Sequence, residues 1–146
     1  MQNFEAGGRL PQLDQELLYR CVEGYFAARD RGELGRFRDF LAPDFDHEIV
    51  GPIGPYPCFG PGRGLESYQW RIGYFNSTYE RLKPRILEMK VFANDVVLKK
   101  TVFARNWGTG RSVWLEACVW LKFHDGLITH YTEYVDTDSL VRVLQG

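Results

Sequence analysis

Glu133 is the residue in this sequence that is best suited to acid–base chemistry. It lies in the stretch LITHYTEYV, residues 127–135, where β-branched and aromatic residues predict a strand. Since side chains alternate along a strand, Tyr131 and Val135 share the face of Glu133. A carboxyl group enclosed on an apolar face loses hydration, so its pKa rises and it can carry a proton near neutral pH. If that face is instead the outer one, Glu133 forms half of an ion pair.

A second candidate is His47, in the stretch DFDHEIV that also reads as a strand. Every second residue of a strand lies on the same face, so His47 shares a face with Ile49 and Gly51. This places His47 beneath the Gly- and Pro-rich stretch that follows. A histidine there can act as a base at physiological pH, or it can be an ordinary hydrogen-bonded strand residue. Its neighbours Asp46 and Glu48 point to the opposite face, so we expect no metal site.

Two helices are expected before these strands. Residues 1–11 have no hydrophobic period and are expected to form a loose N-terminal arm. From about residue 11 to residue 31, apolar residues recur every three or four positions, which predicts an amphipathic helix that ends at Gly32. Residues 33–41 predict a shorter helix that ends before Pro43.

The middle of the chain predicts a strand, a loop and a third helix. The strand covers residues 44–50, and residues 51–64, GPIGPYPCFGPGRG, predict a rigid loop without regular structure that could serve as a lid. Residues 65–82 have helical spacing, and Pro84 is expected to end that helix. Its apolar stripe includes Tyr68, Ile72 and Phe75.

The remaining chain predicts mostly sheet. Residues 85–93, 96–105, 112–123 and 127–135 are separated by turn signals and predict an antiparallel meander, followed by a short amphipathic segment over residues 139–144. Helices followed by strands indicate an α+β fold, in which helices cover one face of the sheet.

Composition narrows the functional classes. The 146 residues suit a single domain, and the net charge of −1 comes from 18 basic and 19 acidic residues spread along the chain, so neither nucleic acid nor membrane is an expected partner. An aromatic content of 15% suits a pocket with flat apolar walls. Three widely spaced cysteines and the lack of a signal-like stretch favour a cytoplasmic protein.

The order of elements resembles the nuclear transport factor 2-like superfamily over nearly the whole chain. The stretch FHDGLITHYTEYVDTDSLVRVL is similar to the last strand of SnoaL-like polyketide cyclases and limonene epoxide hydrolases, and YFAARDRGELGRFRDFLAPDF resembles the first helices of ketosteroid isomerases. The resemblance implies a single SnoaL-like α+β barrel domain over residues 12–146. Its curved antiparallel sheet would form a cone, with the N-terminal helices packed on the concave face and enclosing a pocket.

The resemblance also implies roles for particular residues. Glu133 takes the place of the family's aspartate and faces the cavity, and Tyr25 takes the place of an oxyanion-hole tyrosine. Lys100 lies near the level of the epoxide hydrolases' bridging arginine, where it could pair with Glu133 or hold an anionic group; a bulge would turn Lys99 inward instead. The expected substrate-binding residues are Lys100, Tyr131, Val119, Val135, Tyr68, Ile72, Phe75 and Leu115.

Other positions depart from the family's catalytic sets. Gly51 stands at the isomerases' general-base position, and Val119 stands where isomerases have an aspartate and cyclases a histidine. Val102, on the third predicted strand of the chain, replaces the epoxide hydrolases' aspartate. Steroid isomerisation in its usual form is therefore not expected.

These observations predict an enzyme that needs no cofactor and moves a proton on a small apolar organic molecule. Glu133, His47 and Tyr25 are the expected catalytic residues, and cyclisation in polyketide or terpenoid biosynthesis is the favoured reaction. An epoxide hydrolase, dehydratase or isomerase is an alternative, and a non-catalytic binding or dimerisation module is another. Trp114 and Trp120 share the opposite face of their strand from Leu115 and Val119, which predicts a homodimer interface there.

Overall fold

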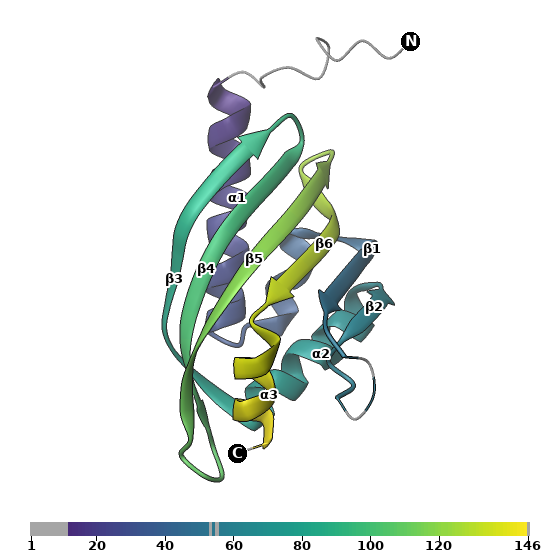
Figure 1. Ribbon diagram of the computed structural model, residues 1–146. Coiled ribbons are helices and arrows are strands. Elements are labelled where there is room, and N and C mark those ends of the chain that lie inside the picture. The colour runs from purple at the N-terminus through teal and green to yellow at the C-terminus, as the bar shows by residue number, and fades with distance from the viewer. Residues whose placement is uncertain (1–11, 53, 55, 146) are drawn as a thin grey trace.

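Six strands form one curved, open sheet that carries helices on one face and at one end (Figure 1). The computed structural model describes residues 12–52, 54 and 56–145, so the predicted arm lies outside the described residues. The elements in chain order are α1 (Gln12–Asp30), η2 (Leu34–Asp39), β1 (Leu41–Val50), β2 (Gly60–Arg63), α2 (Leu65–Thr78), β3 (Tyr79–Phe92), β4 (Asp95–Asn106), β5 (Ser112–His124), β6 (Leu127–Val135) and α3 (Thr137–Gln145). The predicted α+β class is confirmed.

The strand order is β2-β1-β6-β5-β4-β3. Strands β3 to β6 form the predicted antiparallel meander, but β1 pairs with β6 in parallel, so the expectation of a wholly antiparallel sheet was wrong. Parallel neighbours need a long connection, and here α2 and the three strands β3 to β5 lie between β1 and β6 in the chain. This pairing places Ile49 beside Glu133, and His47 beside Tyr131.

The third helix ends earlier than predicted, at Thr78, and β3 begins at Tyr79. The hydroxyl of Thr78 donates to the carbonyl of Tyr74 at 2.8 Å, a local bond that competes with helix continuation. Pro84 therefore does not end a helix. It lies in β3, beside Lys83 with φ 51°, where the pairing with β4 is irregular. An edge strand tolerates this proline because one of its sides needs no ladder partner.

The Gly- and Pro-rich loop contains a strand that composition did not predict. Residues Gly60–Arg63 form β2 and pair with β1, again at a sheet edge where Pro61 is tolerated. The predicted lid includes residues 53 and 55, which lie outside the described residues. Near the N-terminus, the second predicted helix is a 3₁₀ helix, and β1 already starts at Leu41.

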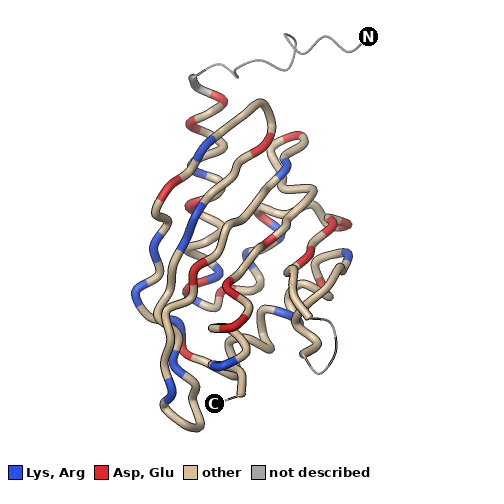
Figure 2. The backbone as a smooth tube through the Cα atoms, in the orientation of Figure 1, with Lys and Arg blue, Asp and Glu red and all other residues tan. Residues whose placement is uncertain are grey.

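The core lies between the sheet and helices α1 and α2 (Figure 1). Helix α1 buries Val22, Tyr25 and Phe26 against it, and α3 anchors the other end through Leu140 and Val143. Basic and acidic residues both occur throughout the described part of the chain (Figure 2). No helix in the described part of the chain is long and apolar enough to cross a membrane.

Candidate functional site

Glu133 lies on the inner face of β6, as its family resemblance implied. It is 5% exposed, and Tyr131 on the same face is 1% exposed. The strand register places Val119 of β5 on one side of Glu133 and Ile49 of β1 on the other. Glu133 is therefore a buried residue in the middle of the sheet, with an apolar residue beside it on each neighbouring strand.

Two cations and a phenol contact this carboxylate. Nη1 of Arg29 lies 3.0 Å from Oε1 of Glu133, and Nζ of Lys100 lies 3.3 Å from the same oxygen. The hydroxyl of Tyr131 donates to Oε1 and accepts from Nη1 of Arg29 at 2.6 Å. These side chains come from α1, β4 and β6, so the cluster joins a helix to two strands of the sheet.

The charge state of Glu133 differs from the expectation. Burial alone would raise its pKa, but the charges of Lys100 and Arg29 and the hydrogen bond from Tyr131 outweigh burial and hold the pKa well below its usual range. The prediction of a raised pKa was therefore wrong, because it treated the neighbours on the strand face as the whole environment. Glu133 is a fixed negative charge near neutral pH.

Lys100 is the group of the cluster that titrates near neutrality. Burial lowers its pKa to about 7, and repulsion by Arg29 acts in the same direction, while Glu133 opposes both. Its Nζ also lies 4.9 Å from the centre of the Phe26 ring. Lys99 is exposed on the other face of β4, which answers the question of which lysine points inward.

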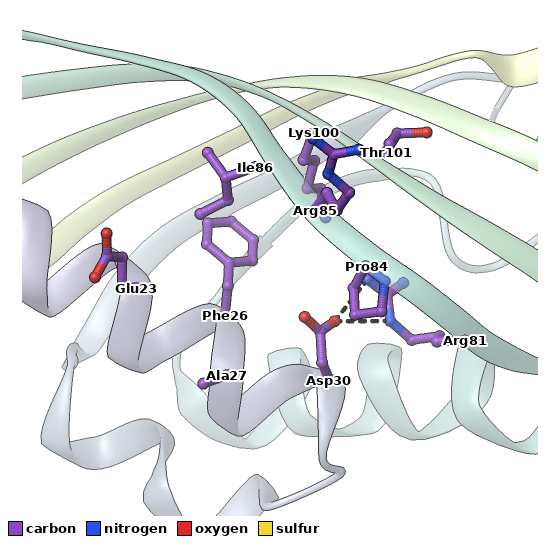
Figure 3. Close-up of a pocket in the computed structure, with 10 residues that line it drawn as sticks. All are labelled: Glu23, Phe26, Ala27, Asp30, Arg81, Pro84, Arg85, Ile86, Lys100 and Thr101. Carbon is purple, nitrogen blue, oxygen red and sulfur yellow. Dashed lines mark hydrogen bonds and ion pairs between the residues drawn. The ribbon is translucent and has the colours of Figure 1, made fainter.

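A pocket opens beside Lys100 between α1, β3 and β4 (Figure 3). Its volume is about 270 Å³, and its lining residues are Glu23, Phe26, Ala27, Asp30, Arg81, Pro84, Arg85, Ile86, Lys100 and Thr101. Asp30 and Arg81 form an ion pair of 3.0 Å in its wall. Lys100 both lines this pocket and contacts Glu133, so it connects the pocket to the buried carboxylate.

Tyr25 and Tyr68 extend the cluster inward. Both are fully buried, and their hydroxyl groups bond to each other. Burial, then the neighbouring Tyr68, raises the pKa of Tyr25 well above its usual value, and burial likewise raises that of Tyr68. Their rings pack against Tyr131 with centroids 5.9 and 5.4 Å away. Tyr25 is thus a protonated phenol whose hydroxyl bonds to Tyr68. The hydroxyl that bonds to Glu133 is that of Tyr131.

His47 belongs to a separate hydrogen-bonded group. Its Nδ1 lies 3.0 Å from Nη1 of Arg71, and its Nε2 lies 2.8 Å from Oγ of Ser67. Burial and the charge of Arg71 lower its pKa to about 4, so the ring is neutral. Arg71 can only donate, so Nδ1 accepts and Nε2 carries the hydrogen. Both nitrogens are occupied, and His47 contacts neither Lys100 nor Glu133 through a hydrogen bond in the described structure.

Most of the predicted substrate-binding residues lie in the core. These are Tyr68, Ile72, Phe75, Leu115, Val119 and Tyr131, with Val135 half-buried at the core's margin. The pocket beside Lys100 is instead lined by residues that the sequence did not indicate. Arg81 lies on β3 at a position that was expected to be helical, so its place beside α1 was not predictable from that assignment. Ile86 lies in the predicted strand, but its strand alone did not indicate a pocket.

Arg29 is the functional candidate that sequence reasoning missed. It is 2% exposed and lies four residues after Tyr25 and seven after Val22, on the buried side of α1. An arginine that continues an apolar helical stripe was the available signal, because a buried cation requires a partner. Among the described residues, no group of three His, Cys, Asp or Glu side chains is arranged to hold a metal ion.

Comparison with solved structures places this fold among NTF2-like proteins. One of unknown function from Burkholderia pseudomallei superposes with a TM-score of 0.81 at 19% identity, covering 89% of this chain and 98% of that chain. An LEH-like epoxide hydrolase from M. tuberculosis gives 0.67 at 19% identity, covering 86% and 87%. A protein from Jannaschia, provisionally named a SnoaL-like polyketide cyclase, gives 0.71 at 14% identity, covering 88% and 93%. These identities establish the fold alone.

The sequence itself matches a known domain family. No curated protein sequence matches this chain. Residues 22–131, however, match the SnoaL-like domain, and this range includes Arg29, Lys100 and Tyr131. The match covers well over half of the chain, and the solved structures share its curved sheet and helices. This protein therefore belongs to the SnoaL-like family.

Proposed function

We propose that this protein is a cytoplasmic enzyme of small-molecule metabolism, in which Lys100 moves a proton on an apolar substrate and Glu133 is its fixed counter-ion. The observation that carries the proposal is the position of Lys100, which lines the pocket and lies 3.3 Å from the carboxylate. A lysine with a pKa of about 7 can both accept and return a proton at neutral pH. Lys100 thus takes the acid–base role expected of Glu133.

Cyclisation of a polyketide or terpenoid precursor is the reaction we favour. The neutral amine of Lys100 would remove a proton from carbon next to a carbonyl group, and the resulting enolate carbon would attack an electrophilic carbon of the same molecule. The ammonium would then return the proton to the oxygen that becomes negative. Once Lys100 has taken the proton, Arg29, Lys100 and Glu133 together carry one net positive charge, which stabilises the enolate. The apolar wall formed by Phe26 and Ile86 suits such a substrate.

An epoxide hydrolase is the second candidate, because an ionised carboxylate lies beside a protonated donor. The Lys100 ammonium would protonate the epoxide oxygen as the ring opens, and the neutral amine would then take up the proton released by the attacking water, with Glu133 as counter-ion. The epoxide hydrolase of similar fold from M. tuberculosis supports this alternative at the level of fold. Dehydration and isomerisation need the same proton transfer, whereas a binding module needs only the pocket.

The experiment is a turnover assay with small apolar polyketones and epoxides, with products identified by mass spectrometry. We expect Lys100→Met to lower kcat by about 10²–10⁴-fold, because it removes the group that carries the proton. Lys99→Met, on the exposed face of the same strand, is the matched control and should retain full activity. Full turnover in Lys100→Met would exclude the assigned role. Ligand binding that is lost only in the pocket-filling variant Ala27→Trp, without turnover in any variant, would favour a binding module.

We also propose that the protein is a homodimer through the outer face of the sheet. Trp114 and Trp120 of β5 are 52% and 46% exposed there, next to the exposed side chain of Tyr134 on β6. Exposed aromatic side chains on one sheet face are typical of an interface between subunits.

Sedimentation velocity tests this prediction. We expect twice the chain mass of 17.0 kDa, and the monomer mass when Trp114 and Trp120 are both replaced by aspartate. Trp70→Asp, which alters an equally exposed tryptophan on α2, should leave the dimer intact. A wild-type protein that sediments as a monomer at micromolar concentration would refute the interface.

A further inference from the structure

The Lys100 side chain is accessible to a bound molecule although it is largely buried. It is 9% exposed, and it forms part of the wall of the pocket between α1, β3 and β4 (Figure 3). Phe26 and Ile86 form an apolar surface next to it. A small organic molecule held against that surface would meet the amine directly.

The charges around Lys100 favour its neutral form. Arg29 and Lys100 both contact Oε1 of Glu133, so two buried cations share one anion. Arg81 and Asp30, which also face Lys100, form an ion pair whose charges cancel. Glu23 and Arg85, which line the same pocket, carry opposite charges. Arginine does not lose its proton in proteins, so the excess charge is relieved only when Lys100 loses its own. The neutral amine is the nucleophilic form of lysine.

We propose that Lys100 also acts as a nucleophile and forms an imine with an aldehyde or ketone that occupies this pocket. This goes beyond proton transfer, because it makes a covalent bond between the protein and its ligand. Nζ attacks the carbonyl carbon, and one proton moves from the nitrogen to the carbonyl oxygen to give a neutral carbinolamine. One proton from solvent then allows that oxygen to leave as water, and a protonated C=N bond remains.

Glu133 is the counter-ion available to the product of this reaction, and it shares its Oε1 with Arg29. Amine, carbonyl compound and one proton become a protonated imine and one water, so the nitrogen regains the positive charge that an ammonium would have. Oε1 of Glu133, 3.3 Å from Nζ, then serves as counter-ion to the imine. Tyr131 holds that oxygen in place through its hydrogen bond. No oxidant, reductant or metal takes part in the step.

Reductive trapping of the full chain tests the proposal. The protein is incubated at pH 7 with butanal and sodium cyanoborohydride, which reduces an imine to a stable secondary amine, and each lysine is then read by peptide mass mapping. An ordinary lysine is neutral in roughly one molecule per thousand or fewer at this pH. We therefore expect butyl addition at Lys100 to be at least about tenfold faster than at Lys99, the exposed neighbour on the same strand.

Two variants distinguish imine formation in the pocket from non-specific modification of lysine side chains. Ala27→Trp fills the pocket and should slow the addition at Lys100 while leaving Lys99 unaffected. Lys100→Arg should abolish the fast addition while its circular dichroism spectrum stays that of the wild type. Addition at Lys100 no faster than at Lys99 would overturn the imine proposal even if turnover is present. Fast addition at Lys100, with full turnover in Lys100→Met, would support the imine and overturn the proton-transfer role instead.

Discussion

Replacing Glu133 with glutamine is expected to lower the free energy of unfolding by about 3–5 kcal/mol at pH 7. Glutamine keeps the shape of the side chain but removes the charge that faces Arg29 and Lys100. Lys100 can respond by losing its proton, but Arg29, which is 2% exposed, remains a buried cation without its carboxylate. Urea unfolding followed by tryptophan fluorescence measures the change.

The matched control is Glu116→Gln, which removes the same charge from the exposed face of the neighbouring strand β5. We expect that variant to remain within about 0.5 kcal/mol of the wild type, as is usual for surface positions. If Glu133→Gln costs no more than Glu116→Gln, the buried charge cluster does not stabilise the fold as its geometry indicates.

Lys100 is expected to add about 2–3 kcal/mol of stability between pH 7 and pH 9. Its pKa is about 7 in the folded protein and 10.5 as an ordinary lysine, so the unfolded chain binds more protons over this range. Each pH unit then adds at most about 1.4 kcal/mol. Below pH 7 both states carry the proton and the contribution of Lys100 is constant.

Other groups set the limits of this window. Burial raises the pKa of Cys21 and of Cys58 from 9.0 to about 11, so above pH 9 the folded protein retains protons that the unfolded chain loses. Stability then falls as pH rises further. At the acid end, His47 has a folded pKa of about 4 against 6.5, which adds a separate rise between those values.

Urea midpoints measured from pH 5 to pH 9 test the assignment. In Lys100→Met the rise between pH 7 and 9 should disappear, while the acid-side rise from His47 should remain. Lys99→Met should follow the wild-type profile. A rise of equal size in the wild type and in Lys100→Met would show that another group titrates in this window.

Much of the fold was predictable because hydrophobic spacing and turn signals act locally. The four strands of the meander and the first helix are each specified by their own residues. Their ends were predicted to within one residue, except for the start of β3. The bounds of the edge strands were harder to predict. The pairing of β2 with β1, and the start of β3 at Tyr79, depend on neighbours distant in sequence that let glycine and proline residues lie in a sheet edge.

The candidate site was predictable only in part, for a similar reason. Alternation along β6 together with the family resemblance indicated that Glu133 faces inward, and the same reasoning brought Lys100 near it. The charge state was not predictable from one strand. It depends on Arg29, which lies on α1 more than one hundred residues before Glu133 in the sequence, and on the burial of Lys100. A pKa is a property of the assembled neighbourhood.

The most direct test of the role of Lys100 is its own titration. With ¹³C-labelled lysine, the Cε resonance of Lys100 can be assigned by its absence in Lys100→Arg and followed from pH 5 to pH 11. A midpoint near pH 7 is expected, since burial and Arg29 favour the neutral amine. A midpoint near the ordinary lysine value of 10.5 would contradict both the proton-transfer role and the nucleophilic role.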